Sequence, residues 1–408
     1  MGRSIKFLEY QILTTLSFAL LVSVLAGKAY SPLIPLIMNS INLSYTEAAL
    51  LTTVQFIAYA AFQIPMGYAV DKYGPRKLIS IGLICVGIFS ILFSMSTNLT
   101  QALITRALIG LATSTVFVPG LRSIGDWLSI KKRGLAMGIF GSAASVSISL
   151  SGLSAPFLAM NLDWLYSILI LSLPSIILGL FSYKLLIDRD NVNNVNNVNN
   201  VNNDSSDNKR NSSSDQIVKN LILSKNSLFL GLNQFFRWGM DNAFLVWLPT
   251  YLYTSKDFSL FESGIFLMAS GLLGMLGNIS GGYLSDKINS RLNVVLISWI
   301  GLAISFFTLV LVNYPIFIVI VVFSISWFGN SHRSPMFAII PDLFETESTG
   351  LTTGIQNTWA NFGGVLIPLM IGVLRDSTGS FDIGWISLAI FATAMIIFNI
   401  YFKRLVKL

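Results

Sequence analysis

The sequence predicts an all-α polytopic membrane protein, with twelve transmembrane helices in two six-helix pseudo-symmetric halves. Three observations carry this prediction: the apolar composition, its division into runs of membrane-spanning length, and a motif that occurs twice. Hydrophobic residues make up 53% of the 408 residues and charged residues only 11%, whereas an average soluble domain has roughly 25% charged residues. This apolar surplus is too large for one soluble core.

The apolar residues fall into runs of about 20, the length that a helix needs to cross the hydrocarbon layer. The runs are continuous rather than alternating, which excludes a transmembrane β-barrel. No small-residue cleavage site follows Arg3 and Lys6, so we expect the first span to be retained. The expected spans are 10–38, 45–70, 77–96, 103–128, 134–158, 164–186, 227–253, 262–285, 292–312, 315–340, 350–374 and 383–402.

A ten-residue motif occurs as GYAVDKYGPR at 67–76 and as GYLSDKINSR at 282–291. Each copy follows one apolar run and precedes another. Further residues repeat in the same order and at one constant spacing: Pro119, Asp126, Gly134 and Gly138 match Pro335, Asp342, Gly350 and Gly354. Such a duplication is typical of membrane transporters built from repeated units.

The two halves are separated by a segment of different composition. Four consecutive Val-Asn-Asn units at 192–203 precede a stretch of Ser, Asp, Asn and Lys. So little apolar mass cannot bury a core, so we expect a flexible tether. The predicted domains are an N-terminal six-helix half at 1–187, a cytoplasmic Asn-rich disordered linker at 188–226, and a C-terminal six-helix half at 227–408.

The basic residues outside the spans predict the orientation of the chain, whose net charge is +7. If the N-terminus is cytoplasmic, nearly all of these residues lie on the cytoplasmic side, and only Lys256 and Arg375 lie outside. Short basic loops stay in the cytoplasm. We therefore expect a multi-pass protein of the cell membrane with both termini cytoplasmic, and we attribute its basicity to topology rather than to a nucleic-acid partner.

The pattern G-x-x-x-D-K-x-G-x-R after the second span resembles the loop motif of the major facilitator superfamily, and the copy after the eighth span resembles its weaker repeat. Several strings are also similar to the anion:cation symporter branch of that family: QIPMGY, Arg122 ahead of Trp127 and Arg133, WLPTYL, and NFGG followed by Pro368. The resemblance implies the major facilitator fold and secondary active transport by alternating access.

By the same resemblance, the motif residues form a cytoplasmic latch. It comprises glycines that permit close helix approach and two Asp–Arg–Asp sets. The expected gating residues are Gly67, Asp71, Arg76 and Asp126 in the first half, and Gly282, Asp286, Arg291 and Asp342 in the second. The alternative is a set of ordinary interfacial charges that orient the helices and contribute little individually.

Charged side chains inside the spans mark the expected substrate site, because an ionisable group at mid-bilayer costs at least ~2.5 kcal/mol. Four cations face a single mid-membrane carboxylate, Asp241, and desolvated positive charge needs an anionic partner. We therefore expect a small organic anion of carboxylate type, to which Arg offers bidentate contacts. The expected substrate-binding residues are Lys28, Tyr30, Arg122, Arg237, Arg333 and Asn330.

Alternatives to this site remain open at the sequence level. Arg237 and Asp241, four residues apart on one helix face, could form a self-contained pair. Arg122 could reach the cytoplasmic interface, and Lys28 could be neutral. Arg106, near the outer end of the fourth span, is expected to extend to the external interface.

Asp241 and His332 are the candidates for coupling to a proton, since a histidine can titrate near physiological pH. The competing roles are a permanent partner of Arg237 for Asp241 and an ordinary hydrogen-bonding residue for His332. The expected partners are the anion, the coupling ion and the lipid bilayer, and the chain is expected to be a monomer.

Other functional classes have weaker support in the sequence. There is no phosphate-cradling loop, metal-ligand cluster or nucleophile motif, so we expect no enzymatic activity, no cofactor and no metal site. The alternatives are an exporter of neutral or amphipathic metabolites or drugs from the same superfamily, and a membrane receptor or channel that does not transport by alternating access.

Overall fold

The structure is a computed structural model that describes residues 5–188, 224–344 and 349–406. Within these ranges every regular element is helical. Eleven helical spans of this described part are long and apolar enough to cross a membrane. Most of the predicted linker, and with it the expectation of disorder, lies outside the described residues.

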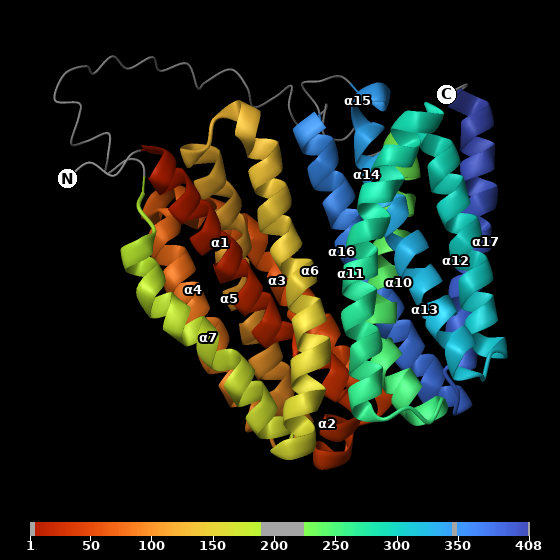
Figure 1. Cartoon of the computed structure of the whole chain (residues 1–408), viewed down its shortest axis with the longest axis horizontal. Helices are drawn as coiled ribbons and strands as arrows, with labels where there is room; N and C mark the ends of the chain where they lie inside the picture. The colour runs from red at the N-terminus through yellow and green to blue at the C-terminus, as the bar shows by residue number, and fades with distance from the viewer. Residues whose placement is uncertain (1–4, 189–223, 345–348, 407–408) are drawn as a thin grey trace. The chain divides into compact units, whose positions relative to one another are not determined.

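The helices follow the predicted spans closely (Figure 1). In the first half they are α1 (Ile5–Lys28), η1 (Ser31–Leu33), α2 (Ile34–Ile41), α3 (Tyr45–Tyr73), α4 (Pro75–Ser94), α5 (Leu99–Trp127), α6 (Ile130–Asn161) and α7 (Trp164–Leu185). In the second half they are α10 (Lys225–Ser255), α11 (Leu260–Ile288), α12 (Arg291–Leu311), α13 (Pro315–Ser331), α14 (Arg333–Ala338), α15 (Ile340–Leu343), α16 (Thr349–Thr378) and α17 (Asp382–Val406).

α10 coincides with the remaining predicted span, 227–253, but it is not among the eleven apolar ones. It is an uninterrupted helix of 31 residues, yet polar side chains lower its hydropathy. These are Asn233, Gln234, Arg237, Asp241 and Asn242. The polar character of this long helix is what places charged groups inside the fold.

Local sequence signals set the helix boundaries. Ser44 and Glu47 form a capping box at the start of α3, and the side chain of Asn98 accepts the backbone N–H of Gln101 at the start of α5; both satisfy N–H groups that lack helical partners. Between α3 and α4 the chain turns at Gly74, whose φ is +78°. The matching turn before α12 uses Asn289 at φ +51°, a conformation that glycine adopts most readily.

The first and the tenth predicted spans are each broken. α1 ends at Lys28 and is followed by η1, which carries Pro32 at its start. α13 ends at Ser331, and α14 begins at Arg333 after one intervening residue, His332. Proline removes a backbone donor and favours such interruptions. Both breaks therefore lie next to a charged side chain that the sequence places in the substrate site.

The described residues divide into two compact units. Unit 1 contains residues up to 188 together with 245–272, and unit 2 contains 224–244 together with the residues from 273 onward. Aliphatic and aromatic side chains of α1, α5 and α6 form the core of unit 1. In unit 2, Phe306 stacks on Trp385 with ring centroids 6.1 Å apart, and Phe244 meets Phe306 edge-on.

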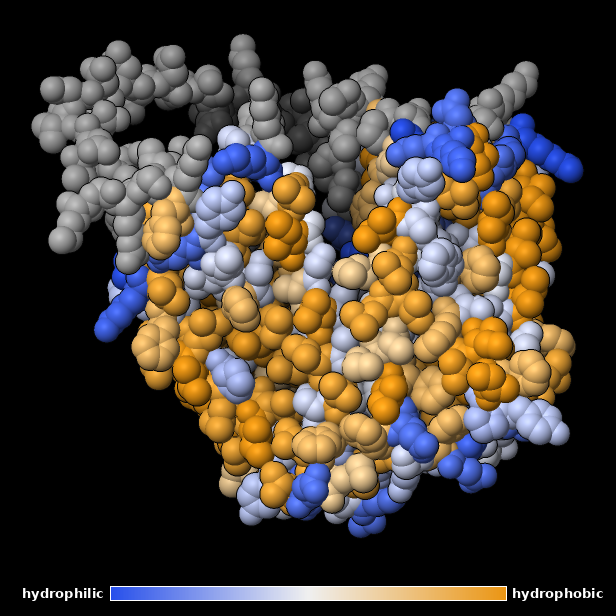
Figure 2. Space-filling model, viewed as in Figure 1, coloured by the Kyte–Doolittle hydropathy of each residue, from blue (hydrophilic) through white to orange (hydrophobic). Residues whose placement is uncertain are grey.

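The outer faces of the helices are apolar in both units. Leu180, Ile304 and Ile397 are each more than 60% exposed, and Figure 2 shows hydrophobic side chains along the helices, with hydrophilic ones gathered towards helix ends. So much exposed apolar surface is suited to a lipid environment. The prediction of an all-α polytopic membrane protein is confirmed.

Candidate functional site

The break in the first span presents Lys28. This residue ends α1 and is half-buried, and its Nζ lies 4.7 Å from the ring centroid of Phe56 on α3. A cation is favoured both over an aromatic face and at the carboxyl end of a helix. These contacts are compatible with a structural role and with a binding role.

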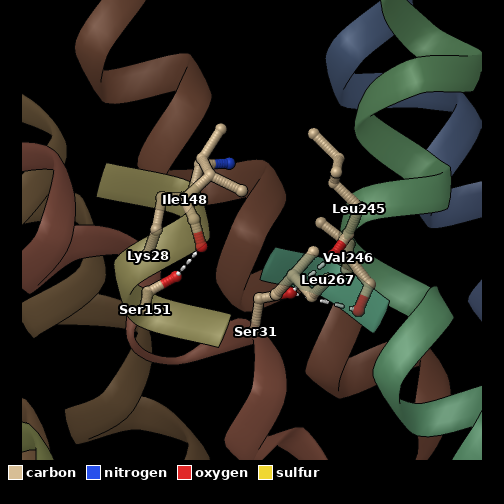
Figure 3. Close-up of a pocket in the computed structure, with 7 residues that line it drawn as sticks. All are labelled: Lys28, Ser31, Ile148, Ser151, Leu245, Val246 and Leu267. Atoms are coloured by element: carbon tan, nitrogen blue, oxygen red, sulfur yellow. Dashed lines mark hydrogen bonds between the residues drawn. The ribbon is translucent and has the colours of Figure 1, made fainter. Parts of the chain in front are cut away.

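A small recess of unit 1 lies beside this break. Figure 3 shows Lys28 and Ile148 on one side of it and Leu245 and Val246 on the other. Ser31 Oγ–H donates to the carbonyl of Leu245 over 2.8 Å. The recess has room for about one water molecule, so it is too small to hold an organic anion in this conformation.

Tyr30 is buried behind the same break and lies against Arg106. The guanidinium of Arg106 is 4.4 Å from the Tyr30 ring centroid, and its Nη1–H donates to the carbonyl of Gly27 over 3.0 Å. The Tyr30 hydroxyl donates to the carbonyl of Ala48. Arg106 is only 2% exposed, so the expectation that it extends to the interface was wrong: its hydrogen bonds to backbone carbonyls replace water.

Arg122 lies with two of the predicted gating carboxylates. Its Nη1 is 3.7 Å from Asp71 Oδ1 on α3, and its Nε is 3.1 Å from Asp126 Oδ2 one turn further along α5. More than half of the Arg122 side chain is exposed. The structure therefore joins a residue expected in the substrate site to residues expected in the latch.

Arg76, the motif arginine expected between these carboxylates, makes other contacts. Its Nε–H donates to the carbonyl of Tyr183, and its guanidinium lies 4.0 Å from the Tyr183 ring centroid. Its backbone N–H donates to Asp188 Oδ1 over 3.1 Å. Arg76 thus fastens the start of α4 to the end of α7, and the arginine that bridges Asp71 and Asp126 is Arg122.

The second copy of the motif contacts the broken tenth span. Arg291 Nη1–H donates to the carbonyl of Ala338 at the end of α14. A Cβ atom at Gly282 would lie 2.8 Å from Ser334 Oγ, whereas one at Gly67 would meet no atom within 4 Å. Asp286 is exposed, and the side chain of Asp342 lies outside the described residues.

Unit 2 contains the most deeply buried cation of the predicted site. Arg237 is 4% exposed, and its Nε–H donates to Gln234 Oε1 over 3.0 Å. Its Nη1 is buried and has no hydrogen-bond partner among the residues that the structure describes. A buried donor without an acceptor is costly, so this guanidinium is suited to an additional acceptor.

Three further predicted residues lie close to Arg237. Asn330 Nδ2–H donates to Asp241 Oδ1 over 3.3 Å, and Asp241 is within electrostatic reach of both Arg237 and Arg333. Arg333 and Arg237 are also within electrostatic reach of each other. The structure therefore brings together two arginines, a carboxylate and an amide from α10, α13 and the start of α14.

His332 is completely buried at the break between α13 and α14. Its ring lies against Trp299 of α12, with centroids 5.0 Å apart, and its Nδ1 is 3.3 Å from the carbonyl of Phe328. Trp299 Nε1–H donates to Asn233 Oδ1 over 2.9 Å. No spacing in the sequence connects Trp299 with His332, because the two residues lie on different spans.

A polytopic helical bundle with a buried cation inside one span and further cations at breaks in two others is typical of a membrane solute transporter. The chain belongs to the Major Facilitator Superfamily, whose sequence model matches residues 16–368 and 276–407. The match confirms the family that the duplicated motif resembles.

Two curated relatives and one solved structure are similar along most of the chain. A probable galactarate/D-glucarate transporter of Bacillus subtilis (strain 168) is 24% identical over 80% of this chain and 76% of its own length. A probable L-galactonate transporter of Escherichia coli (strain K12) is 24% identical over 94% and 86%. A bacterial homologue of the human lysosomal transporter Spinster, 14% identical, matches the fold with a TM-score of 0.82 over 96% of both chains.

Proposed function

We propose that this protein is a secondary active transporter that carries a small organic anion of carboxylate type across the cell membrane by alternating access, coupled to a proton. The observation that carries the proposal is the arginine pair of unit 2. Arg237 is almost fully buried with an Nη1 that lacks an acceptor among the described residues, and Arg333 adds a second positive charge within its reach.

The substrate class follows from the chemistry of this pair. Asp241 is a carboxylate within electrostatic reach of both guanidinium groups. A carboxylate ligand would supply the acceptor that Arg237 Nη1 lacks, in the bidentate geometry that arginine offers. The relatives are named for galactarate, D-glucarate and L-galactonate, which are hydroxylated carboxylates. We take these three compounds as the first substrates to test.

The proposed anion site lies within unit 2, where Arg237, Arg333 and Asn330 bind the carboxylate. Asp241 carries the proton: once protonated, it no longer neutralises the arginines, which are then free to hold the anion.

The cytoplasmic latch completes the proposal. Arg122 bridges Asp71 and Asp126, and this bridge must open during turnover. The basic loops favour a cytoplasmic position for the motif copies and for both termini. The bilayer covers the exposed apolar faces of both units.

Uptake into proteoliposomes tests the proposal. We expect the wild-type protein to accumulate at least one of the three anions when an inward proton gradient is imposed. We expect no uptake of a neutral hexose under the same conditions. Arg237→Gln and Arg333→Gln should each reduce uptake at least about tenfold, the loss of one charged hydrogen bond. The matched control is Lys184→Gln, at an exposed cation on α7. Equal uptake by all four proteins would overturn the proposal.

A further inference from the structure

We infer that His332 is a positioning residue: its imidazole, wedged between Trp299 and the end of α13, holds the break that presents Asn330 and Arg333 to the anion. The inference rests on the proposed function, because it takes Asn330 and Arg333 as anion-binding residues. It assigns to His332 a role different from that of a proton carrier.

The first support is the set of contacts that the imidazole makes. Nδ1 lies 3.3 Å from the carbonyl of Phe328, an acceptor, so this nitrogen carries the hydrogen. The ring is tilted by 35° against the Trp299 indole at a centroid distance of 5.0 Å, within the range of favourable aromatic pairs. Since His332 itself separates α13 from α14, these contacts set the angle at which the chain continues to Arg333.

The second support is that Trp299 is itself held in place. Its Nε1–H donates to Asn233 Oδ1 of α10, and the same oxygen accepts Asn399 Nδ2–H of α17 over 3.0 Å. All of these side chains are buried. His332 therefore packs against an indole whose position is restrained by hydrogen bonds among α10, α12 and α17.

The backbone beside His332 is confined from two directions. Ser331 Oγ is 2.7 Å from Ser298 Oγ on α12. On the other side, a Cβ at Gly281 of α11 would lie 1.7 Å from the Ser331 carbonyl oxygen, and one at Gly277 would lie 2.5 Å from the Trp327 carbonyl oxygen. The backbone before His332 is thus packed closely, so we expect a change at the His332 ring to shift Asn330 and Arg333 rather than to be absorbed by free space.

The same contacts weigh against a proton-carrying role. His332 has no exposed surface, and its ring face and Nδ1 are engaged by Trp299 and by the backbone. Its Nε2 has no hydrogen-bond partner within the described residues. Arg237 on α10 is within electrostatic reach of His332. Asp241, the carboxylate we assign to the proton, is within electrostatic reach of Arg237 and of Arg333.

Substitutions at both members of the ring pair test the inference in the full-length protein. His332→Phe keeps an aromatic ring against Trp299, whereas His332→Ala and Trp299→Leu remove the pair. We expect the last two to raise KM for D-glucarate exchange about two- to tenfold, as expected for the loss of an aromatic pair, with kcat less affected. His332→Phe should stay within about twofold of wild type. The double variant His332→Ala/Trp299→Leu should be no worse than either single variant, because both remove one contact.

Proton-driven uptake separates positioning from proton transfer. His332→Phe should keep the wild-type dependence of uptake on the proton gradient, whereas Asp241→Asn should lose it and keep exchange. If His332→Phe abolished gradient-driven uptake but kept exchange, or if the two losses were additive in the double variant, the inference would be overturned.

A measurement without substrate keeps the inference testable if the transport proposal fails. In a Cys85→Ser background, Arg333→Cys provides one thiol whose alkylation rate reports on exposure of the break. Adding His332→Ala or Trp299→Leu should raise that rate several-fold, and adding His332→Phe should not. An unchanged rate in all variants would contradict the positioning role, whether or not the protein transports these anions.

Discussion

The two copies of the loop motif share a sequence pattern but form hydrogen bonds with different parts of the fold. The first copy is tied to the end of α7, because Arg76 contacts Tyr183 and Asp188. The second copy is tied to the broken tenth span, because Arg291 donates to the carbonyl of Ala338 at the end of α14. A duplicated motif therefore need not perform the same task twice.

The surroundings of the glycines also differ between the two copies of the motif. A Cβ at Gly282 would lie 2.8 Å from the Ser334 hydroxyl, and the neighbouring Gly281 lies against the Ser331 backbone. In the first copy, Gly67 faces open space and Met66 stands where the second copy has Gly281. Because α14 begins at Arg333, we expect changes in the second copy to alter anion affinity and changes in the first to alter turnover.

The largest expected effect is at Gly281. Gly281→Ala would place a Cβ 1.7 Å from a backbone oxygen, which forces the break to move, and overpacking of this kind costs about 1–3 kcal/mol. We expect uptake of D-glucarate to fall about tenfold or more and the thermal unfolding midpoint to drop. Met66→Ala is the matched control and should change both much less. Equal effects at the two positions would remove the distinction between the copies.

A smaller effect is expected at the two motif arginines. Arg291→Gln removes a cation from the carboxyl end of α14 and should raise KM about threefold to tenfold, the range for a hydrogen bond from a charged group. Arg76→Gln should lower kcat and leave KM near wild type, since its contacts lie at the end of α7. The kcat and KM of D-glucarate exchange, measured for both variants, test this difference. If Arg76→Gln changed KM as much as Arg291→Gln, the two motif copies would have the same effect on anion affinity, which contradicts the expectation.

The smallest effects concern the turn residues, which can be exchanged between the copies. Gly74 has φ +78°, and a Cβ there would lie 2.9 Å from Asp188 Oδ2; Gly74→Asn should therefore lower the unfolding midpoint. Asn289 already adopts φ +51°, so Asn289→Gly should be neutral or slightly stabilising, by at most about 1 kcal/mol. Thermal unfolding in detergent measures both. A destabilising Asn289→Gly together with a neutral Gly74→Asn would contradict the described turns.

The helices were predictable because hydropathy runs and turn residues are local signals. The breaks in the first and tenth spans were not predicted, because a proline within an apolar run, such as Pro119 of α5, need not interrupt the helix. The partners of the arginines were less accessible to sequence reasoning. Arg76 and Arg122 both lie near helix ends close to Asp71, and the rotation of each helix about its axis decides which of them reaches the carboxylate.

Buried side-chain partners from different spans were likewise beyond the sequence. The contact of Trp299 with His332 joins α12 to the tenth span, and Arg106 turns inward to the carbonyl of Gly27. The two contacts depend on how the helices pack against one another, and the spacing of residues along the sequence does not predict that packing. By contrast, the grouping of Arg237, Asp241 and Arg333 was predictable from charge, since buried cations seek counter-charges.

Calorimetric titration of the purified protein with D-glucarate measures whether Arg237 binds the anion. We expect saturable binding by wild type, at least about tenfold weaker binding by Arg237→Gln, and unchanged binding by Lys184→Gln. Wild-type affinity in Arg237→Gln would contradict the claim that the buried arginine of unit 2 holds the anion.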